Sequence, residues 1–134
     1  FTSRHKHDIE LVDRVRRITA NDAVRLGDIG VLARQRHEVT KLLTAFKAAG
    51  IEAINLEDYD GNPVDAVKVG TIKRAKGLEF AHVLAARTPG SLLASAAVEI
   101  PESGERERLA LELRELYVAM TRARDGLWVG VIIS

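Results

Sequence analysis

The segment TIKRAKGLEF, which starts at Thr71, combines cationic side chains, a glycine and a carboxylate within ten residues. Thr71, Lys73 and Arg74 are the kinds of groups that hold a nucleic-acid backbone. Gly77 permits backbone conformations and close approaches that other residues forbid, and Glu79 follows it closely. The combination suggests phosphate contact, although a polar loop between two strands is the simpler interpretation of the segment taken alone.

Two arginines elsewhere in the chain could stabilise phosphate charge. Arg34 follows an apolar segment and precedes a helical pattern, and its planar guanidinium suits phosphate oxygens. Arg122 lies near the end of the longest helical pattern, where it could stabilise a transferring phosphoryl group. Simpler interpretations remain for both, namely an exposed surface residue for Arg34 and compensation of the helix dipole for Arg122.

Other kinds of site find little support in the sequence. The four histidines have no metal-ligating companions at suitable spacing, so we expect no metal site. The absence of cysteine excludes a disulfide framework and a thiolate zinc site, and it fits a reducing compartment. The patterns G-x-x-x-x-G-K-[ST], G-x-G-x-x-G and G-x-S-x-G do not occur.

The composition is that of one ordinary globular domain. Of the 134 residues, 46% are hydrophobic and 29% are charged, and the formal net charge of +1 means that any basic surface must be local. Because no apolar run approaches the length of a membrane span and no signal peptide precedes the fold, we expect a cytoplasmic protein. The chain opens with Phe1 rather than Met, so we expect a piece of a longer polypeptide.

Helical and strand patterns alternate along the chain and position the candidate residues. Helical spacing of apolar residues predicts three helices, at 8–19, 35–49 and 105–123. Short apolar runs predict five strands, at 28–33, 51–56, 67–71, 82–86 and 127–133. Asp125 and Gly126 predict a turn before the last strand. Because the strands are too continuously apolar to be half exposed, we expect a three-layer α/β domain with a mainly parallel sheet and helices on both faces.

Ligands of such sheets bind outside the carboxyl ends of the strands. Arg34 follows the first predicted strand, residues 71–79 follow the third, and Arg87 follows the fourth. We therefore expect all of these residues at the carboxyl edge of the sheet.

Three segments in fixed order resemble a known family. They are DIGVLARQRHEVTKLLTAFKAAGI, VKVGTIKRAKGLEFAHV and ELRELYVAMTRAR, and they are similar to motifs IV, V and VI of superfamily 1 DNA helicases of the UvrD/Rep type. The family patterns T-x-H-x-A-K-G-L-E-F and Y-V-A-x-T-R-A are highly specific. The resemblance implies that residues 1–134 form the second RecA-like motor domain, called 2A, of an ATP-dependent DNA helicase or translocase.

The resemblance also implies a role for each matching residue. Arg34 and Arg122 match arginines that reach the γ-phosphate of ATP bound on an upstream RecA-like domain of the same polypeptide, and that domain would also hold Mg²⁺. Gly77 matches a glycine near the phosphates, and Glu79 matches a glutamate that touches the ribose.

Thr71 matches a residue that contacts the backbone of single-stranded DNA. Lys73 and Arg74 complete the expected set of DNA-binding residues.

Further matches and two departures qualify the resemblance. Lys76 matches the motif lysine, and Tyr117 matches an aromatic residue that packs motif VI in place. Lys73 stands where the family pattern has histidine, so it can hold a phosphate but cannot stack an imidazole on a base. Only 36 residues separate Arg34 from Thr71, where UvrD-type helicases insert a large 2B domain, so we expect no 2B insertion here.

The chain alone is expected to be inactive as an ATPase, because it lacks a Walker A lysine and a Walker B acid pair. The main alternative is a standalone nucleic-acid-binding or regulatory module that kept the RecA-like fold without motor activity. A small signalling or nucleotide-binding α/β domain fits less well, because it would carry an acidic or glycine-rich pocket where this sequence has Arg34.

Overall fold

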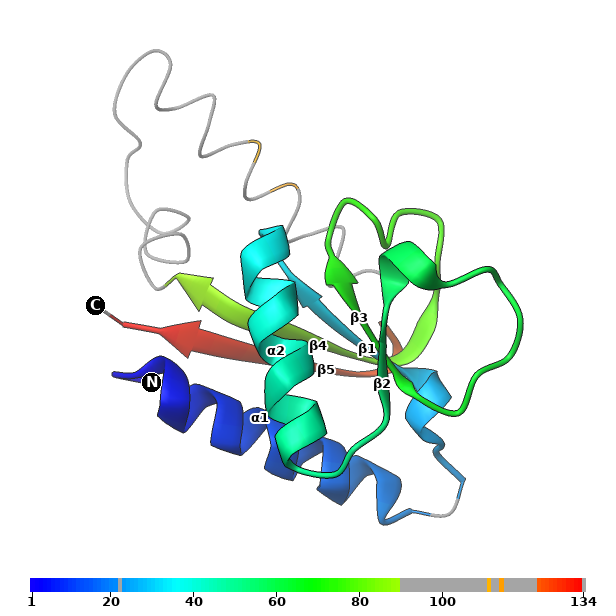
Figure 1. Cartoon of the computed structure of the whole chain (residues 1–134), viewed down its shortest axis with the longest axis horizontal. Helices are drawn as coiled ribbons and strands as arrows, with labels where there is room; N and C mark the ends of the chain where they lie inside the picture. The colour runs from blue at the N-terminus through cyan, green and yellow to red at the C-terminus, as the bar shows by residue number, and fades with distance from the viewer. Residues whose placement is uncertain (22, 90–110, 112–113, 115–122, 134) are drawn as a thin grey trace.

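A five-stranded sheet forms the centre of the computed structural model, which describes residues 1–21, 23–89, 111, 114 and 123–133 (Figure 1). Within these residues all strand pairs are parallel, in the order β2-β3-β1-β4-β5. The strands are β1 (Ile29–Ala33), β2 (Ala53–Asn55), β3 (Val67–Thr71), β4 (Phe80–Pro89) and β5 (Ala123–Ile132). The predicted α/β fold with a mainly parallel sheet is therefore confirmed.

Two helices, α1 (Arg4–Thr19) and α2 (Arg36–Ala48), pack on one face of the sheet (Figure 1). The Ser3 hydroxyl caps α1 by accepting a hydrogen bond from the backbone N–H of Lys6 at 3.1 Å. The helix therefore begins before residue 8, where the apolar pattern alone predicts its start. Apolar side chains of both helices share one core with the sheet, including Leu11, Val15, Leu42, Phe46, Val31, Val69 and Leu84.

The opposite face of the sheet carries a second, smaller core. Because side chains alternate along a strand, Leu32 and Val83 point away from the two helices. They pack with Leu56, from the short 3-10 helix η2 (Leu56–Asp58), and with Phe80. The predicted helix 105–123 falls largely outside the described residues, so the expectation of helices on both faces stays a prediction.

The bounds of β1, β2, β4 and β5 differ from the predicted ones, those of β1 by a single residue at its start. β2 stops at Asn55 because the Asn55 side chain accepts the backbone N–H of Glu57 at 3.0 Å and starts η2. β4 continues to Pro89, and β5 already begins at Ala123. The turn predicted at residues 125–126 is wrong, since both residues lie inside β5. A Cβ at position 126 would lie 2.5 Å from the His82 ring, so the glycine there serves close packing rather than a turn.

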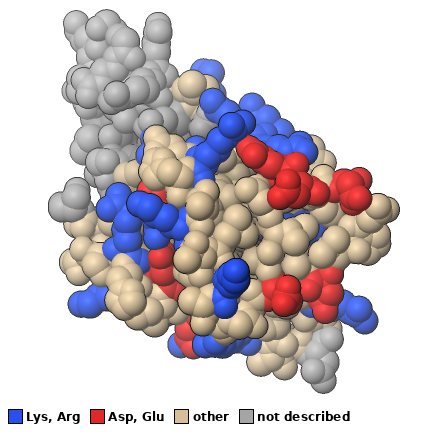
Figure 2. Space-filling view, viewed as in Figure 1, with Lys and Arg blue, Asp and Glu red and all other residues tan. Residues whose placement is uncertain are grey.

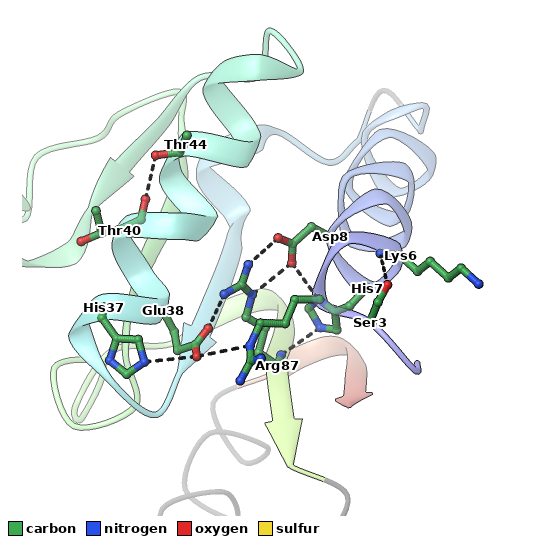
Figure 3. Close-up of polar contacts among 10 residues, drawn as sticks. Ser3, Lys6, His7, Asp8, His37, Glu38, Thr40, Thr44 and Arg87 are labelled. Carbon is green, nitrogen blue, oxygen red and sulfur yellow. Dashed lines mark hydrogen bonds and ion pairs between the residues drawn. The ribbon is translucent and has the colours of Figure 1, made fainter. Parts of the chain in front are cut away.

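A buried arginine joins both helices to β4 (Figure 3). The Arg87 side chain is only 5% exposed and donates hydrogen bonds to Asp8 on α1 and to Glu38 on α2. Arg87 Nη2 lies 2.5 Å from Asp8 Oδ2, and Nε lies 3.2 Å from Asp8 Oδ1. The backbone N–H of Arg87 donates to Nε2 of buried His7 at 2.8 Å, so the ring proton of His7 must sit on Nδ1, 2.9 Å from Asp8.

The backbone at Arg87 is unusual as well. Its φ of +52° is rare for a residue other than glycine, and it falls where the pairing of β4 with β5 is irregular, between Ala85 and Thr88. The contacts to both helices hold the backbone in this conformation. The guanidinium is thereby committed to the fold, so the expectation that Arg87 serves a ligand at the carboxyl edge is wrong.

The two carboxylates of this cluster are held in their charged form. Burial alone would raise the pKa of Asp8, but hydrogen bonds from His7 and Arg87 and the Arg87 charge outweigh burial and lower that pKa below its ordinary 3.8. Burial likewise opposes ionisation of Glu38. The hydrogen bond and charge of Arg87, with smaller contributions from the charges of Arg4 and a histidine, lower the Glu38 pKa below 4.5.

Removing the guanidinium should destabilise the fold strongly. The substitution Arg87→Met keeps the aliphatic stem but leaves two largely buried carboxylates without their cation, so we expect a loss on the order of 3 kcal/mol in the free energy of unfolding. Urea denaturation monitored by circular dichroism measures this loss. The matched control is Arg14→Met on the exposed surface of α1. Equal losses for both variants would show that the ion pairs of Arg87 do not stabilise the fold.

The cluster should also make stability depend on acidity. Because the folded pKa values of Asp8 and Glu38 are lowered, their contribution is complete above their ordinary values of 3.8 and 4.5 and is lost as the pH falls through the folded values. We expect the free energy of unfolding to drop between about pH 5 and about pH 3. The double variant Asp8→Asn, Glu38→Gln should show a shallower drop, and an unchanged slope would exclude the cluster as its source.

Candidate functional site

The segment that follows β3 runs from the carboxyl ends of the strands, called here the carboxyl edge of the sheet, to their amino ends, called the amino edge. β3 and β4 both pair with β1, which lies between them, and all three strands are parallel. Thr71 pairs with Ala33, the last residue of β1, whereas His82 pairs with Ile29, the first. The chain therefore leaves β3 at the carboxyl edge and must cross one face of the sheet within residues 72–79 to enter β4 from the amino edge.

This crossing segment, residues 72–79, lies on the face opposite α1 and α2. Ile72 and Ala75 are buried there in the second core, next to Phe80. The backbone N–H of Ile72 donates to the carbonyl of Ala33 at 3.0 Å, and that of Ala75 donates to the carbonyl of Thr71 at 3.2 Å. These anchors fix the course of the backbone while the residues between them remain at the surface.

The three predicted DNA-binding residues lie together at the carboxyl edge. The Thr71 hydroxyl accepts a hydrogen bond from the backbone N–H of Arg74 at 3.2 Å, and both Lys73 and Arg74 are exposed. Figure 2 shows Lys and Arg side chains gathered along the upper rim of this view, above the start of α2 and the crossing segment. A chain with a net charge of +1 thus has a local basic surface at this edge.

Arg34 lies at the same edge as Thr71. It directly follows β1 and is half-buried, and its neighbour Ala33 pairs with Thr71. Thr71 also lines a small cavity of about 170 Å³, together with Asn55 and residues at the start of α2. The carboxyl edge therefore brings Arg34 and the predicted DNA-binding residues together beside a concave polar surface.

Glu79 lies toward the amino edge, so the expectation that the whole segment sits at the carboxyl edge is wrong. Glu79 is exposed and immediately precedes Phe80, the first residue of β4. Gly77 has a φ of +83°, which disfavours any side chain, and a Cβ there would meet no atom within 4 Å. The prediction treated all residues that follow the third strand as if they stayed at its end. The crossing segment instead returns along the sheet, so its first and last residues are separated by about 16 Å, the length of a five-residue strand.

Arg122 and Tyr117 lie outside the described residues. Ala123 begins β5 and pairs with Phe80, so the chain re-enters the described structure beside the Glu79 end of the crossing segment. Arg34 lies at the other edge. The expectation that Arg34 and Arg122 reach one phosphate group stays a prediction.

Lys68 is a buried cation that its apolar strand pattern conceals. Its Nζ donates to the carbonyl of Gly27 at 2.7 Å and lies 4.8 Å from the centre of the Tyr59 ring. Burial lowers the pKa of Lys68, although the charge of Asp28 opposes that change. Lys68 thus fastens the 3-10 helix η1 (Leu26–Asp28) to the sheet, and a single charged residue inside an apolar run was the signal that could have revealed it.

In the described part of the chain, no three side chains of the His, Cys, Asp or Glu type are grouped to hold a metal ion. None of the helices described is both long enough and apolar enough to cross a membrane.

Comparison with known proteins identifies the family. Residues 54–133 match the model of the UvrD-like helicase C-terminal domain. This range is more than half of the chain and contains the whole crossing segment. The chain belongs to the UvrD-like helicase C-terminal domain family. The resemblance to UvrD/Rep-type helicases that rests on the sequence motifs is therefore confirmed.

Two relatives place this UvrD-like domain among helicase sequences and folds. YjcD of Bacillus subtilis (strain 168), whose name assigns it provisionally to the ATP-dependent DNA helicases, is 32% identical over 105 residues. The match covers 78% of this chain but only 13% of YjcD. The crystal structure of the C-terminal domain of a possible DNA helicase from Lactobacillus plantarum WCFS1 has a TM-score of 0.69 and 20% identity, covering 98% of this chain and 70% of that one. The structural match confirms the RecA-like fold.

Proposed function

We propose that this chain is the C-terminal motor half of an ATP-dependent DNA helicase or translocase. It would work with an upstream RecA-like domain of the same polypeptide, since the chain itself has no Walker A or Walker B pattern. Membership of the UvrD-like family supports the general role. The observation that carries the specific proposal is the crossing segment, which presents cationic residues at one edge of the sheet and an exposed carboxylate at the other.

The residues at the carboxyl edge of the sheet would hold single-stranded DNA. Lys73 and Arg74 would contact phosphates, and the Thr71 hydroxyl could donate to a further phosphate oxygen while still accepting from the backbone of Arg74. Because Lys73 replaces the histidine of the family pattern, this contact would be electrostatic rather than a stacking contact with a base. Such a grip would respond strongly to salt.

The last residues of the crossing segment, at the amino ends of the strands, would face the nucleotide. The exposed Glu79 carboxylate can accept hydrogen bonds from ribose hydroxyls, and the open space at Gly77 leaves room for a close approach of phosphate to the backbone. ATP with Mg²⁺ held by the upstream domain would supply the phosphoryl group that is transferred to water. The family resemblance implies that Arg122 and Arg34 would stabilise the negative charge that develops on that group, with Arg34 reaching it from the carboxyl edge of the sheet.

A continuous segment between the two ends would couple them. Ile72 and Ala75 pack in the second core and tie the crossing segment to the sheet. The two ends of the segment would therefore move together with the domain rather than separately. Closure of the two motor domains around ATP would then displace the DNA-binding residues along the single-stranded DNA. This coupling is the proposed role of the segment in translocation.

The DNA grip can be tested in the full-length protein with Lys73→Ala. Loss of one phosphate contact should weaken binding of an oligothymidylate several-fold and reduce the slope of log K against log salt by about 0.7. Fluorescence anisotropy across a salt series measures both quantities. Lys41→Ala, an exposed lysine on α2, is the matched control, and identical salt slopes for the two variants would remove Lys73 from the DNA site.

The phosphate role can be tested in the same protein with Arg34→Ala and Arg122→Ala. Each change should lower the kcat of DNA-stimulated ATP hydrolysis by about a thousandfold, because it removes charge stabilisation of the transition state, while single-strand affinity stays nearly unchanged. Arg14→Ala, on the exposed face of α1, is the control. If hydrolysis by either variant matches that of the control, the arginine concerned does not act at the phosphate.

A further inference from the structure

The outer edge of β2 is an open strand edge in the described part of the chain. β2 ends the order of strands and pairs only with β3. The carbonyl of Glu52 accepts the backbone N–H of Val67 at 2.9 Å. Backbone groups of successive residues in a parallel strand point alternately to its two sides, so those of Ala53 and Asn55 point away from β3. An edge of this kind is a template for another strand.

A groove of about 780 Å³ follows this edge. One wall comes from α2, with Leu43, and the other comes from the turn after β2, with Tyr59 and Val64. Leu43 packs against the first core and Tyr59 against the second, so the two walls lie on opposite faces of the sheet. The groove therefore encloses the edge of β2 from both sides. The alternating side chains of an added strand would each meet one wall.

The rim of the groove is acidic. Glu52, Asp58 and Asp60 line it with exposed carboxylates, against a single exposed lysine, Lys47. Backbone and side-chain hydrogen bonds from Asn62, each 3.0 Å long, lower the pKa of Asp60 and keep it charged. Figure 2 shows acidic side chains gathered on the right of that view, where β2 and its following turn lie.

We propose that the outer edge of β2 binds an extended segment of a partner protein as an added strand, with apolar residues at alternate positions and Lys or Arg at its ends. The open backbone groups select an extended chain, the half-buried Ile51 and Ile54 offer apolar contact, and the carboxylates select cations. The acidic rim disfavours nucleic acid. It also disfavours a second copy paired through its own β2, because the same carboxylates would then face each other.

This surface is separate from the proposed nucleotide and DNA residues. Of the described ones, Lys73, Arg74 and Glu79 lie on the crossing segment, and Arg34 and Thr71 lie at the carboxyl ends of β1 and β3, whereas the groove lies beyond β3 at the end of the sheet. Asn55 is shared with the small cavity beside Thr71. A bound segment would thus attach a partner without covering the motor residues. The proposal therefore stands or fails independently of the proposed function.

The test uses the full-length protein and a labelled peptide, Lys-Val-Thr-Val-Thr-Val-Lys, in fluorescence anisotropy. Ala53→Pro removes the outward N–H without breaking a bond to β3, since proline is tolerated at such edge positions. It should weaken binding about tenfold, whereas Ala53→Val, which keeps the N–H, should not. A peptide with Glu in place of both Lys residues should bind about tenfold more weakly.

A second variant guards against loss of folding by the proline substitution. Asp58→Asn leaves the backbone intact and should weaken binding of the Lys-ended peptide several-fold while leaving the Glu-ended peptide unaffected or improved. Equal binding of both peptides, full binding by Ala53→Pro, or no binding at about 1 mM peptide would overturn the proposal. Self-association in sedimentation that is lost in Ala53→Pro would assign the edge to a second copy and would overturn it as well.

Discussion

Parallel pairing of β3 and β4 with the strand between them is the constraint on which the candidate site depends. A chain that ends one strand at the carboxyl edge can begin the other only at the amino edge, so residues 72–79 must cross the sheet. The apolar members of the crossing segment anchor it to the second core, which leaves the cationic and acidic members at opposite ends. The proposed DNA and nucleotide contacts would thus come from the two ends of one short segment.

The other face of the sheet provides the rigidity that this arrangement needs. Arg87 holds α1 and α2 against β4 through two carboxylates and a buried histidine, and it keeps an unusual backbone conformation while doing so. Buried charges of this kind are costly unless fully paired, and here each has its partner. The helices are therefore fixed on one face, and among the described residues the crossing segment and η2 pack on the opposite face.

The sequence predicted the parts of the fold that depend on local patterns. The predicted bounds of β3 match those of the structure, and the parallel pairing agrees with the mainly parallel sheet expected from continuously apolar strands. It did not predict the role of Arg87, because its partners Asp8 and Glu38 are 79 and 49 residues away along the chain. It placed Glu79 at the wrong edge, because order along the chain does not reveal how a connection returns across a sheet.

The two ends of the crossing segment are proposed to serve different ligands. Photo-crosslinking tests this most directly, with a photoreactive residue placed in the full-length protein at position 73 or at position 79 and irradiated with labelled single-stranded DNA. Both positions are exposed, so the probe should be tolerated at either. The account predicts DNA cross-links from position 73 and none from position 79. Comparable cross-linking from both positions, or from position 79 alone, would contradict it.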